Sequence, residues 1–268
     1  DQRVATDITA RPYAMEMAQR GFCAFSVDYA RHNMLQYAEG NYIEKSGNIY
    51  SLDLRHSAIN QIMRSDSRCD VTKGVVTSGF SQGGHIALWA KYFLPRYMKG
   101  LLQMSSALGV DWAGALAPTP DIYVHVHQNH VHSRWLGSDF KWMRRSIISE
   151  WDIMFGRCVA DVCFPWNTRG NIPYQQKMLT GHDCGPVDGN ADTIPRPGYD
   201  CIDGDTGSGY YIMTHGEGLE HEFYMNRAGG FTESWATGDR KGSSMKDNFD
   251  WLASCQLEGG CGTGYNPQ

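Results

Sequence analysis

Ser81 stands in a run of small residues that could present its hydroxyl for nucleophilic chemistry. Residues 75–89 read VVTSGFSQGGHIALW, which places Ser81 at the centre of a Gly-x-Ser-x-Gly motif. A serine at a sharp strand-to-helix turn approaches the neighbouring backbone closely, so the flanking positions must lack a Cβ atom. The alternative, an ordinary glycine-rich turn, is disfavoured by the strand pattern before the motif and the helical pattern after it. We therefore predict that Ser81 is a nucleophile and that the backbone N–H of Gln82 faces a developing oxyanion.

The elements that must position Ser81 alternate between helical and strand periodicity. Helical spacing of apolar residues predicts helices over residues 13–20, 51–63, 86–93, 142–155 and 244–253. Short runs of β-forming residues predict strands over 22–27, 74–78, 100–104, 120–126 and 209–214. Such alternation is typical of βαβ units, so we expect an α/β fold with a mostly parallel sheet flanked by helices.

The pattern degrades between residues 135 and 205, where Gly, Pro, Cys and aromatic residues accumulate. We therefore predict a first part of the core over 1–134, a disulfide-rich insertion or lid over 135–205, and a last part of the core over 206–268. The aromatic side chains of the insertion could form an apolar substrate wall or simply pack around disulfides.

The segment Gly79-Phe-Ser-Gln-Gly-Gly84 resembles the nucleophile elbow of the α/β-hydrolase superfamily, and residues 13–29 are similar to the helix and fourth strand of that superfamily. At a finer level the elbow resembles secreted esterases of the polyhydroxybutyrate depolymerase and feruloyl esterase type. The resemblance implies a serine hydrolase that cleaves an ester through an acyl-enzyme, as carboxylesterases, lipases and polyester depolymerases do.

In that superfamily the triad follows the order Ser, acid, His, with the base after the last strand. His215 and His221 both come after the strand predicted at 209–214. The resemblance favours His221, which lies in a Gly-x-x-His setting, over His215. We take His85, within the predicted elbow helix, as a structural residue.

The acid is where the sequence departs from the superfamily pattern. Counting from Pro120 along the predicted strand, the slot for the acid holds Asn129, and an amide cannot stabilise an imidazolium by charge. Asp183 and Asp111 are substitute acids. The usual His-Gly oxyanion loop is also missing before residue 13. These departures leave a second hypothesis open, a catalytically weak or inactive hydrolase-like protein retained for binding or assembly.

Other clusters of polar residues favour structural roles. His125, His127, His130 and His132 crowd one predicted strand end but lack a clear third zinc ligand. Asp203 and Asp205 alternate as in a calcium loop, but without the glutamate at position twelve a tight polar turn is favoured. We therefore expect no metal and no cofactor.

Composition limits the partners and indicates the compartment. The chain has 268 residues, a formal net charge of -5 and no basic run, so we expect neither nucleic acid nor a membrane as a partner, and favour a small or neutral molecule. The resemblance to esterases implies that the substrate is a small or polymeric ester. An even set of eight cysteines predicts disulfides and a secreted or periplasmic protein, with a zinc site at Cys158 and Cys163 as the lesser alternative. The oligomeric state stays open.

Overall fold

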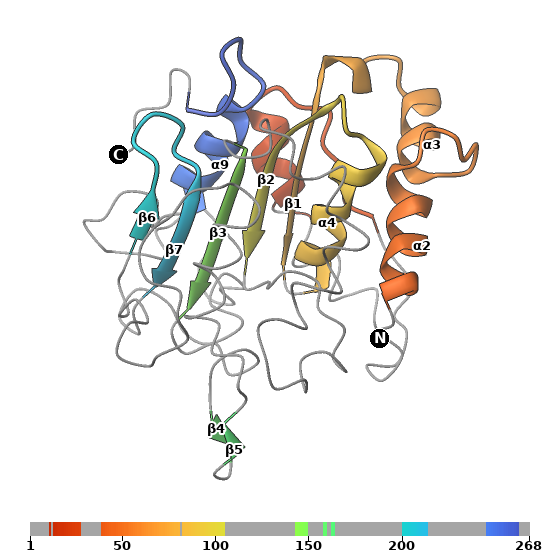
Figure 1. The fold of residues 1–268 in the computed structure, drawn as a ribbon. Helices are drawn as coiled ribbons and strands as arrows, with labels where there is room; N and C mark the ends of the chain where they lie inside the picture. Colours follow the sequence, from red (N-terminus) through yellow and green to blue (C-terminus); the bar gives the residue numbers. More distant parts are fainter. Residues whose placement is uncertain are drawn as a thin grey trace.

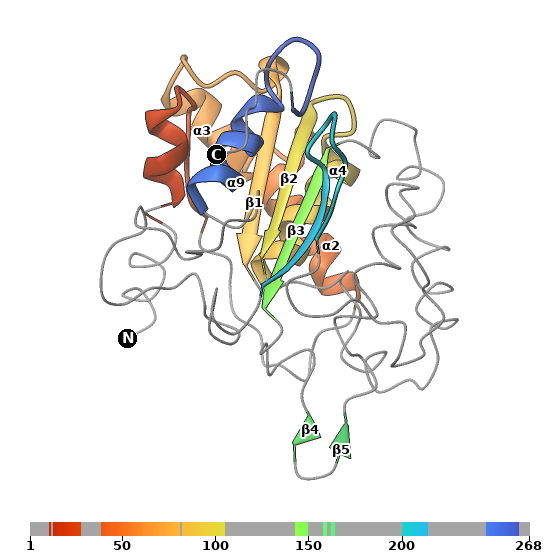
Figure 2. The same cartoon turned by 90° about the vertical axis from the view of Figure 1, so that its left-hand side faces the viewer.

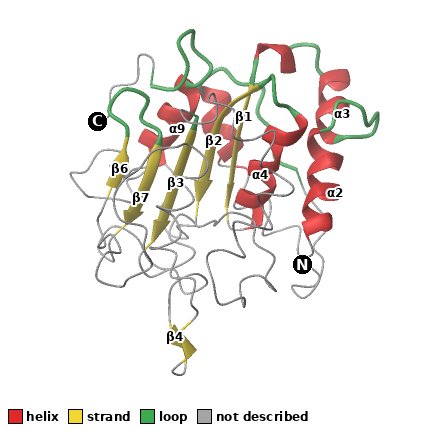
Figure 3. Cartoon of the chain, in the orientation of Figure 1, coloured by secondary structure: helices red, strands yellow, loops and turns green. Residues whose placement is uncertain are grey.

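A five-stranded sheet forms the centre of the molecule (Figure 1). The computed structural model of the chain describes residues 11, 13–27, 39–80, 82–104, 143–149, 158–159, 162–163, 200–213 and 245–262. Within them the strand order is β1-β2-β3-β7-β6, and the strands are β1 (Val75–Phe80), β2 (Met98–Met104), β3 (Arg144–Ser149), β7 (Gly209–Met213) and β6 (Asp200–Ile202). The helices are α2 (Glu39–Tyr50), α3 (Ala58–Ser65), α4 (Gln82–Phe93) and α9 (Met245–Ser254), with a further helical segment over residues 13–19 (Figure 3).

The strands β1, β2, β3 and β7 run parallel, and β6 pairs with β7 in the antiparallel direction. Their register places Phe80, Met104, Ile147 and Tyr211 in one row across the sheet. The carboxyl ends of the four parallel strands therefore meet at a single edge, which is where open α/β sheets gather their ligand sites. This confirms the predicted α/β fold with a mostly parallel sheet.

Helices cover both faces of this sheet. On one face α4 packs through residues 86–90 onto Met98 and Leu101, together with Ile49 of α2. On the other face α9 packs through Phe249, Trp251 and Leu252 onto Leu102 and Ile147, together with Met17 of the N-terminal helix. Figure 2 shows α9 and the N-terminal helix on the same side of the sheet. The alternation of Leu101 and Leu102 between the two clusters follows from the two-residue period of a strand.

The strand β3 corrects the helix predicted over residues 142–155. The prediction was wrong because the two adjacent polar residues Arg144 and Arg145 break the alternation of apolar and polar residues expected of a strand, and a local pattern assigns such residues to solvent. In the structure both side chains are buried, with exposed fractions of 0% and 1%. Since β3 lies between β2 and β7, at least this part of the segment 135–205 belongs to the central sheet.

Other predicted elements are confirmed with small changes of boundary, and two differ. The helices at 13–20, 86–93 and 244–253 and the strands at 74–78, 100–104 and 209–214 are present. Residues 22–27 form no strand in the described structure, although Phe22 and Ala24 pack against the core. The helix predicted at 51–63 begins only at Ala58, because Ser57 caps it by accepting from the N–H of Asn60. Residues 120–126 lie outside the described residues.

Two disulfides hold the described chain, as the cysteine content predicts. Cys23 joins Cys69, and Cys255 joins Cys261 just after α9. The first links the segment after the N-terminal helix to the turn that leads into β1. Next to it Asp70 accepts from the N–H and hydroxyl of Thr72, and these bonds lower the pKa of the Asp70 carboxyl.

No helix in the described part of the chain is long and apolar enough to cross a membrane.

Removing the Cys23–Cys69 bridge should destabilise the protein more than removing the Cys255–Cys261 bridge. The two bridges close loops with sequence separations of 46 and 6 residues. The chain-entropy relation gives about 4 kcal/mol for the first loop and about 2 kcal/mol for the second. Urea denaturation of the double variants C23S/C69S and C255S/C261S measures both losses. An equal loss, or a larger loss for the short loop, would contradict this account.

Candidate active site

The Gly-x-Ser-x-Gly motif lies at the strand-to-helix turn between β1 and α4. β1 ends at Phe80 and α4 begins at Gln82, so Ser81 is the single residue between the two elements. Ser81 itself lies outside the described residues, as do His215, His221, Asn129, Asp183 and Asp111. The structure therefore describes the frame around the predicted nucleophile, namely the flanking glycines, the start of the helix and the edge of the sheet.

The glycines that flank Ser81 pack backbone against backbone. A Cβ atom added to Gly79 would collide with the carbonyl group of Gly83 and would lie 2.6 Å from the nitrogen of Gly84. Backbone atoms cannot rotate away as a flexible side chain can, so residue 79 must be glycine for this turn to form. The close approach predicted from the motif is thus present in the described residues on either side of Ser81.

The helix α4 is held firmly behind this turn. Residues 86–90 are at most 2% exposed, and they include the large side chain of Trp89. The buried hydroxyl of Thr77 on β1 donates to the carbonyl oxygen of Ala87 at 3.1 Å. At the other end, the first N–H groups of α4 have no acceptor within the helix and carry the positive end of its dipole. These groups include the N–H of Gln82, for which the role of oxyanion donor stays a prediction from the motif.

The parallel strands direct three chain segments to the same edge of the sheet. Ser81 follows β1, and the chain that carries His215 and His221 leaves β7 after Met213. The chain that leaves β3 after Ser149 continues into Glu150 and Asp152. The segments that leave β3 and β7 start from adjacent strands, and β2 lies between them and the strand β1 that precedes Ser81.

A buried polar chain, which the sequence analysis missed, reaches the start of α4. The side-chain amide of Gln103 donates to the carbonyl oxygen of Gly84 at 3.1 Å, and the Arg144 guanidinium donates to the Gln103 oxygen at 2.6 Å. Both side chains are 0% exposed. In the sequence, the only sign of this role is that Gln103 is a polar residue within the otherwise apolar run Gly100 to Met104, which indicates a buried polar contact.

The acidic pair in the loop before β7 forms a polar turn, as predicted. Asp203 accepts through one carboxylate oxygen from the N–H of Asp205 at 3.1 Å and from the N–H and hydroxyl of Thr206 at 2.8 and 2.9 Å. This is an Asx turn, in which the carboxylate serves its own backbone. Among the residues that the structure describes, no group of three or more His, Cys, Asp or Glu side chains could hold a metal ion. The four histidines from His125 to His132 lie outside these residues.

Comparisons of the chain with protein-family models, with curated proteins and with solved structures find no match.

Adding a methyl group at Gly79 should damage the turn. Gly79→Ala forces Cβ against the Gly83 carbonyl group, and overpacking of this kind costs about 1–3 kcal/mol. The matched control is Gly204→Ala, because a Cβ at Gly204 meets no atom within 4 Å. Thermal or urea unfolding of both variants checks this. Equal stability of the two variants would contradict the close packing of Gly79.

Proposed function

We propose that this chain is a serine hydrolase that cleaves an ester through an acyl-enzyme, with Ser81 as the nucleophile. The observation that carries the proposal is the close packing of Gly79 against the Gly83 carbonyl group, across a turn that contains only Ser81. A turn that requires glycine two residues before a serine, between a parallel strand and a buried helix, is the arrangement of a nucleophile elbow. On this basis we assign the sheet to the α/β-hydrolase type.

The proposed reaction has two steps. The Ser81 hydroxyl attacks the ester carbonyl carbon while a histidine accepts its proton, and the alkoxide leaves with that proton as an alcohol. A water molecule then attacks the acyl-enzyme, gives its proton to the same histidine and releases the acid, and Ser81 regains a proton. The N–H of Gln82 donates to the oxyanion in both steps. His221 is the proposed base, with His215 as its competitor.

The position of β3 changes the choice of the acid. The assignment of the acid to Asn129 requires residues 120–126 to form the strand that precedes the last one, whereas β3 lies between β2 and β7 in the sheet. The first carboxylates after β3 are Glu150 and Asp152. We therefore propose the chain leaving β3 as the source of the third member, ahead of Asn129, Asp183 and Asp111. A carboxylate there removes the need to assume a catalytically impaired triad.

The proposed setting of the enzyme is extracellular or periplasmic. The two described disulfides support this, because such bonds persist in oxidising compartments. The proposed substrate is a small or polymeric ester, and the finer likeness to secreted esterases and polyester depolymerases stays part of this proposal.

A fluorophosphonate probe tests the nucleophile directly. The wild-type protein should react covalently with the probe, and Ser81→Ala should not, because only an activated serine hydroxyl displaces fluoride from phosphorus. Hydrolysis of p-nitrophenyl esters should fall on the order of 10⁶-fold in the same variant. No labelling of the folded wild-type protein would refute the proposal and favour the alternative, a hydrolase-like binding protein.

The same assay separates the two histidines. His221→Ala should abolish labelling and turnover while the protein remains folded by circular dichroism, and His215→Ala should retain both. The opposite result would transfer the role of base to His215 and leave the nucleophile unchanged.

The acid should lie after β3. Of the five variants Glu150→Gln, Asp152→Asn, Asp183→Asn, Asp111→Asn and Asn129→Ala, we expect a fall in kcat of about 10⁴-fold only for one of the first two. The physical reason is that an amide cannot stabilise the imidazolium by charge. Steady-state kinetics on one ester substrate measures all five. A comparable fall for Asp183, Asp111 or Asn129 alone would contradict the assignment to β3.

A further inference from the structure

We propose that Gln103 is a positioning residue for the nucleophile turn, held in its working orientation by Arg144. This inference rests on the proposed function, because it concerns the same site. Gln103 ties the first turn of α4 to the sheet through the Gly84 carbonyl oxygen and so fixes the N–H groups that follow Ser81.

Gln103 occupies the position from which the turn can be reached. It pairs in register with Gly79, at the same level of the sheet. Its side chain points to the face of the sheet that α4 covers, as does the side chain of Leu101 two residues earlier. Gly79 has no side chain, and the backbone of Gly83 and Gly84 fills the space where one would stand. At this level of the sheet Gln103 therefore supplies a side-chain bond to the start of the helix.

Arg144 decides which end of the Gln103 amide faces the helix. A guanidinium group only donates hydrogen bonds, so the amide group must turn its oxygen toward Arg144. The 2.6 Å bond from the Arg144 Nε atom to the Gln103 oxygen meets this requirement. The amide NH₂ group is left to face the Gly84 oxygen, which it reaches at 3.1 Å. The chain of donors thus has one direction, from Arg144 through Gln103 to Gly84.

The bond to Gly84 acts on catalysis through the helix backbone. Within an α-helix the Gly84 oxygen also accepts from the N–H of Leu88, and a carbonyl oxygen has room for both donors. Anchoring this oxygen to β2 fixes the first turn, including the N–H of Gln82 proposed for the oxyanion. A displacement of about 1 Å at such a donor costs on the order of 10²-fold in rate.

Three variants separate positioning from general stability. Gln103→Glu keeps a partner for Arg144 but places an acceptor where the Gly84 oxygen needs a donor, and Gln103→Met removes both bonds. The matched control is Thr77→Val, which removes the buried hydroxyl bond to Ala87 one turn further along the same helix. In the helix the Ala87 oxygen is the acceptor for the N–H of Lys91.

Residue-resolved hydrogen exchange of the complete protein gives the first readout. In Gln103→Glu and Gln103→Met the N–H of Leu88 should exchange roughly five- to ten-fold faster, the factor expected for one buried hydrogen bond, with Lys91 less affected. In Thr77→Val the N–H of Lys91 should show the larger increase in exchange rate, with Leu88 less affected. Unchanged exchange at Leu88 in both Gln103 variants would overturn the proposal.

Ester kinetics per labelled active site gives the second readout. Both Gln103 variants should lose about 10- to 100-fold in kcat with little change in KM, whereas Thr77→Val should keep its kcat. Faster exchange at Leu88 with an unchanged kcat would reduce Gln103 to a structural residue and overturn its positioning role. Absence of labelling in the wild-type protein would instead refute the proposed function, and Leu88 exchange would still decide whether Gln103 holds the turn.

Discussion

The contact of Gly79 with the backbone of Gly83 and Gly84 is the constraint on which the centre of the molecule depends. It brings the end of β1 and the start of α4 closer together than any side chain at residue 79 would permit. Once the helix starts there, its apolar residues 86–90 are directed onto the sheet and become almost fully buried. The close approach thus decides the path of α4, and it leaves Ser81 as the only residue between strand and helix.

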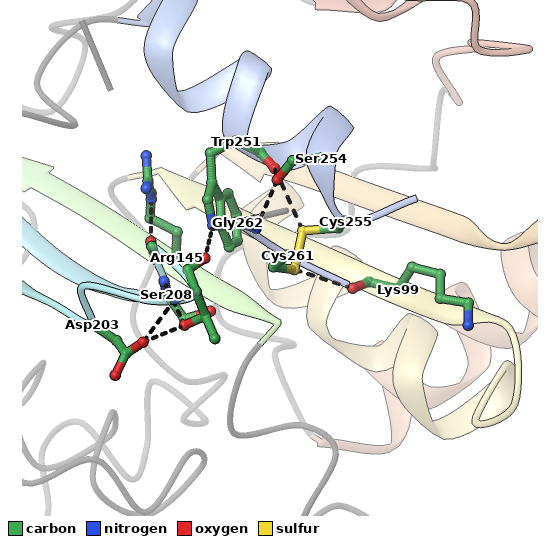
Figure 4. Close-up of a disulfide and its surroundings, with 11 residues drawn as sticks. Lys99, Arg145, Asp203, Ser208, Trp251, Ser254, Cys255, Cys261 and Gly262 are labelled. Carbon is green, nitrogen blue, oxygen red and sulfur yellow. Dashed lines mark hydrogen bonds between the residues drawn. A yellow bond between two sulfur atoms is a disulfide. The ribbon is translucent and has the colours of Figure 1, made fainter. Parts of the chain in front are cut away.

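The two adjacent arginines of β3 serve opposite faces of the sheet. Arg144 points toward α4 and bonds to Gln103. Arg145 points toward α9, where its guanidinium carbon lies 4.6 Å from the centre of the Trp251 ring (Figure 4). It donates to the Asn248 side-chain oxygen on α9 at 3.1 Å and to the Gly207 oxygen in the loop before β7 at 2.8 Å. A salt bridge of 3.4 Å to the buried Asp247 compensates its charge. Each arginine thereby links β3 to elements distant in sequence, and for Arg145 the nearby Asp247 carboxylate offsets the cost of burying its charge.

These partners also explain what the sequence could and could not predict. The strands β1, β2 and β7 and the helices α4 and α9 were predictable because their apolar residues recur with the period of the element. β3 was not, because Arg144 and Arg145 look like solvent-facing positions until Gln103, Gly207 and Asp247 are known to meet them. The strand predicted over residues 22–27 was wrong for the opposite reason, since their pattern is that of a strand but they form none in the described structure. Their β-forming side chains reach the core without any backbone pairing in the described structure.

For the candidate site too, a local pattern predicted only the features that depend on residues close together in the sequence. The local motif was sufficient to find the turn, because the glycine requirement acts between residues that are four apart in sequence. The acid depends on which strand lies next to β7, and that is a property of the whole sheet. With β3 in this place instead of residues 120–126, the proposed acid becomes Glu150 or Asp152 and no longer Asn129, and the chemistry required of it is the same. A triad assembled at a parallel edge is therefore only as predictable as the order of the strands that lead to it.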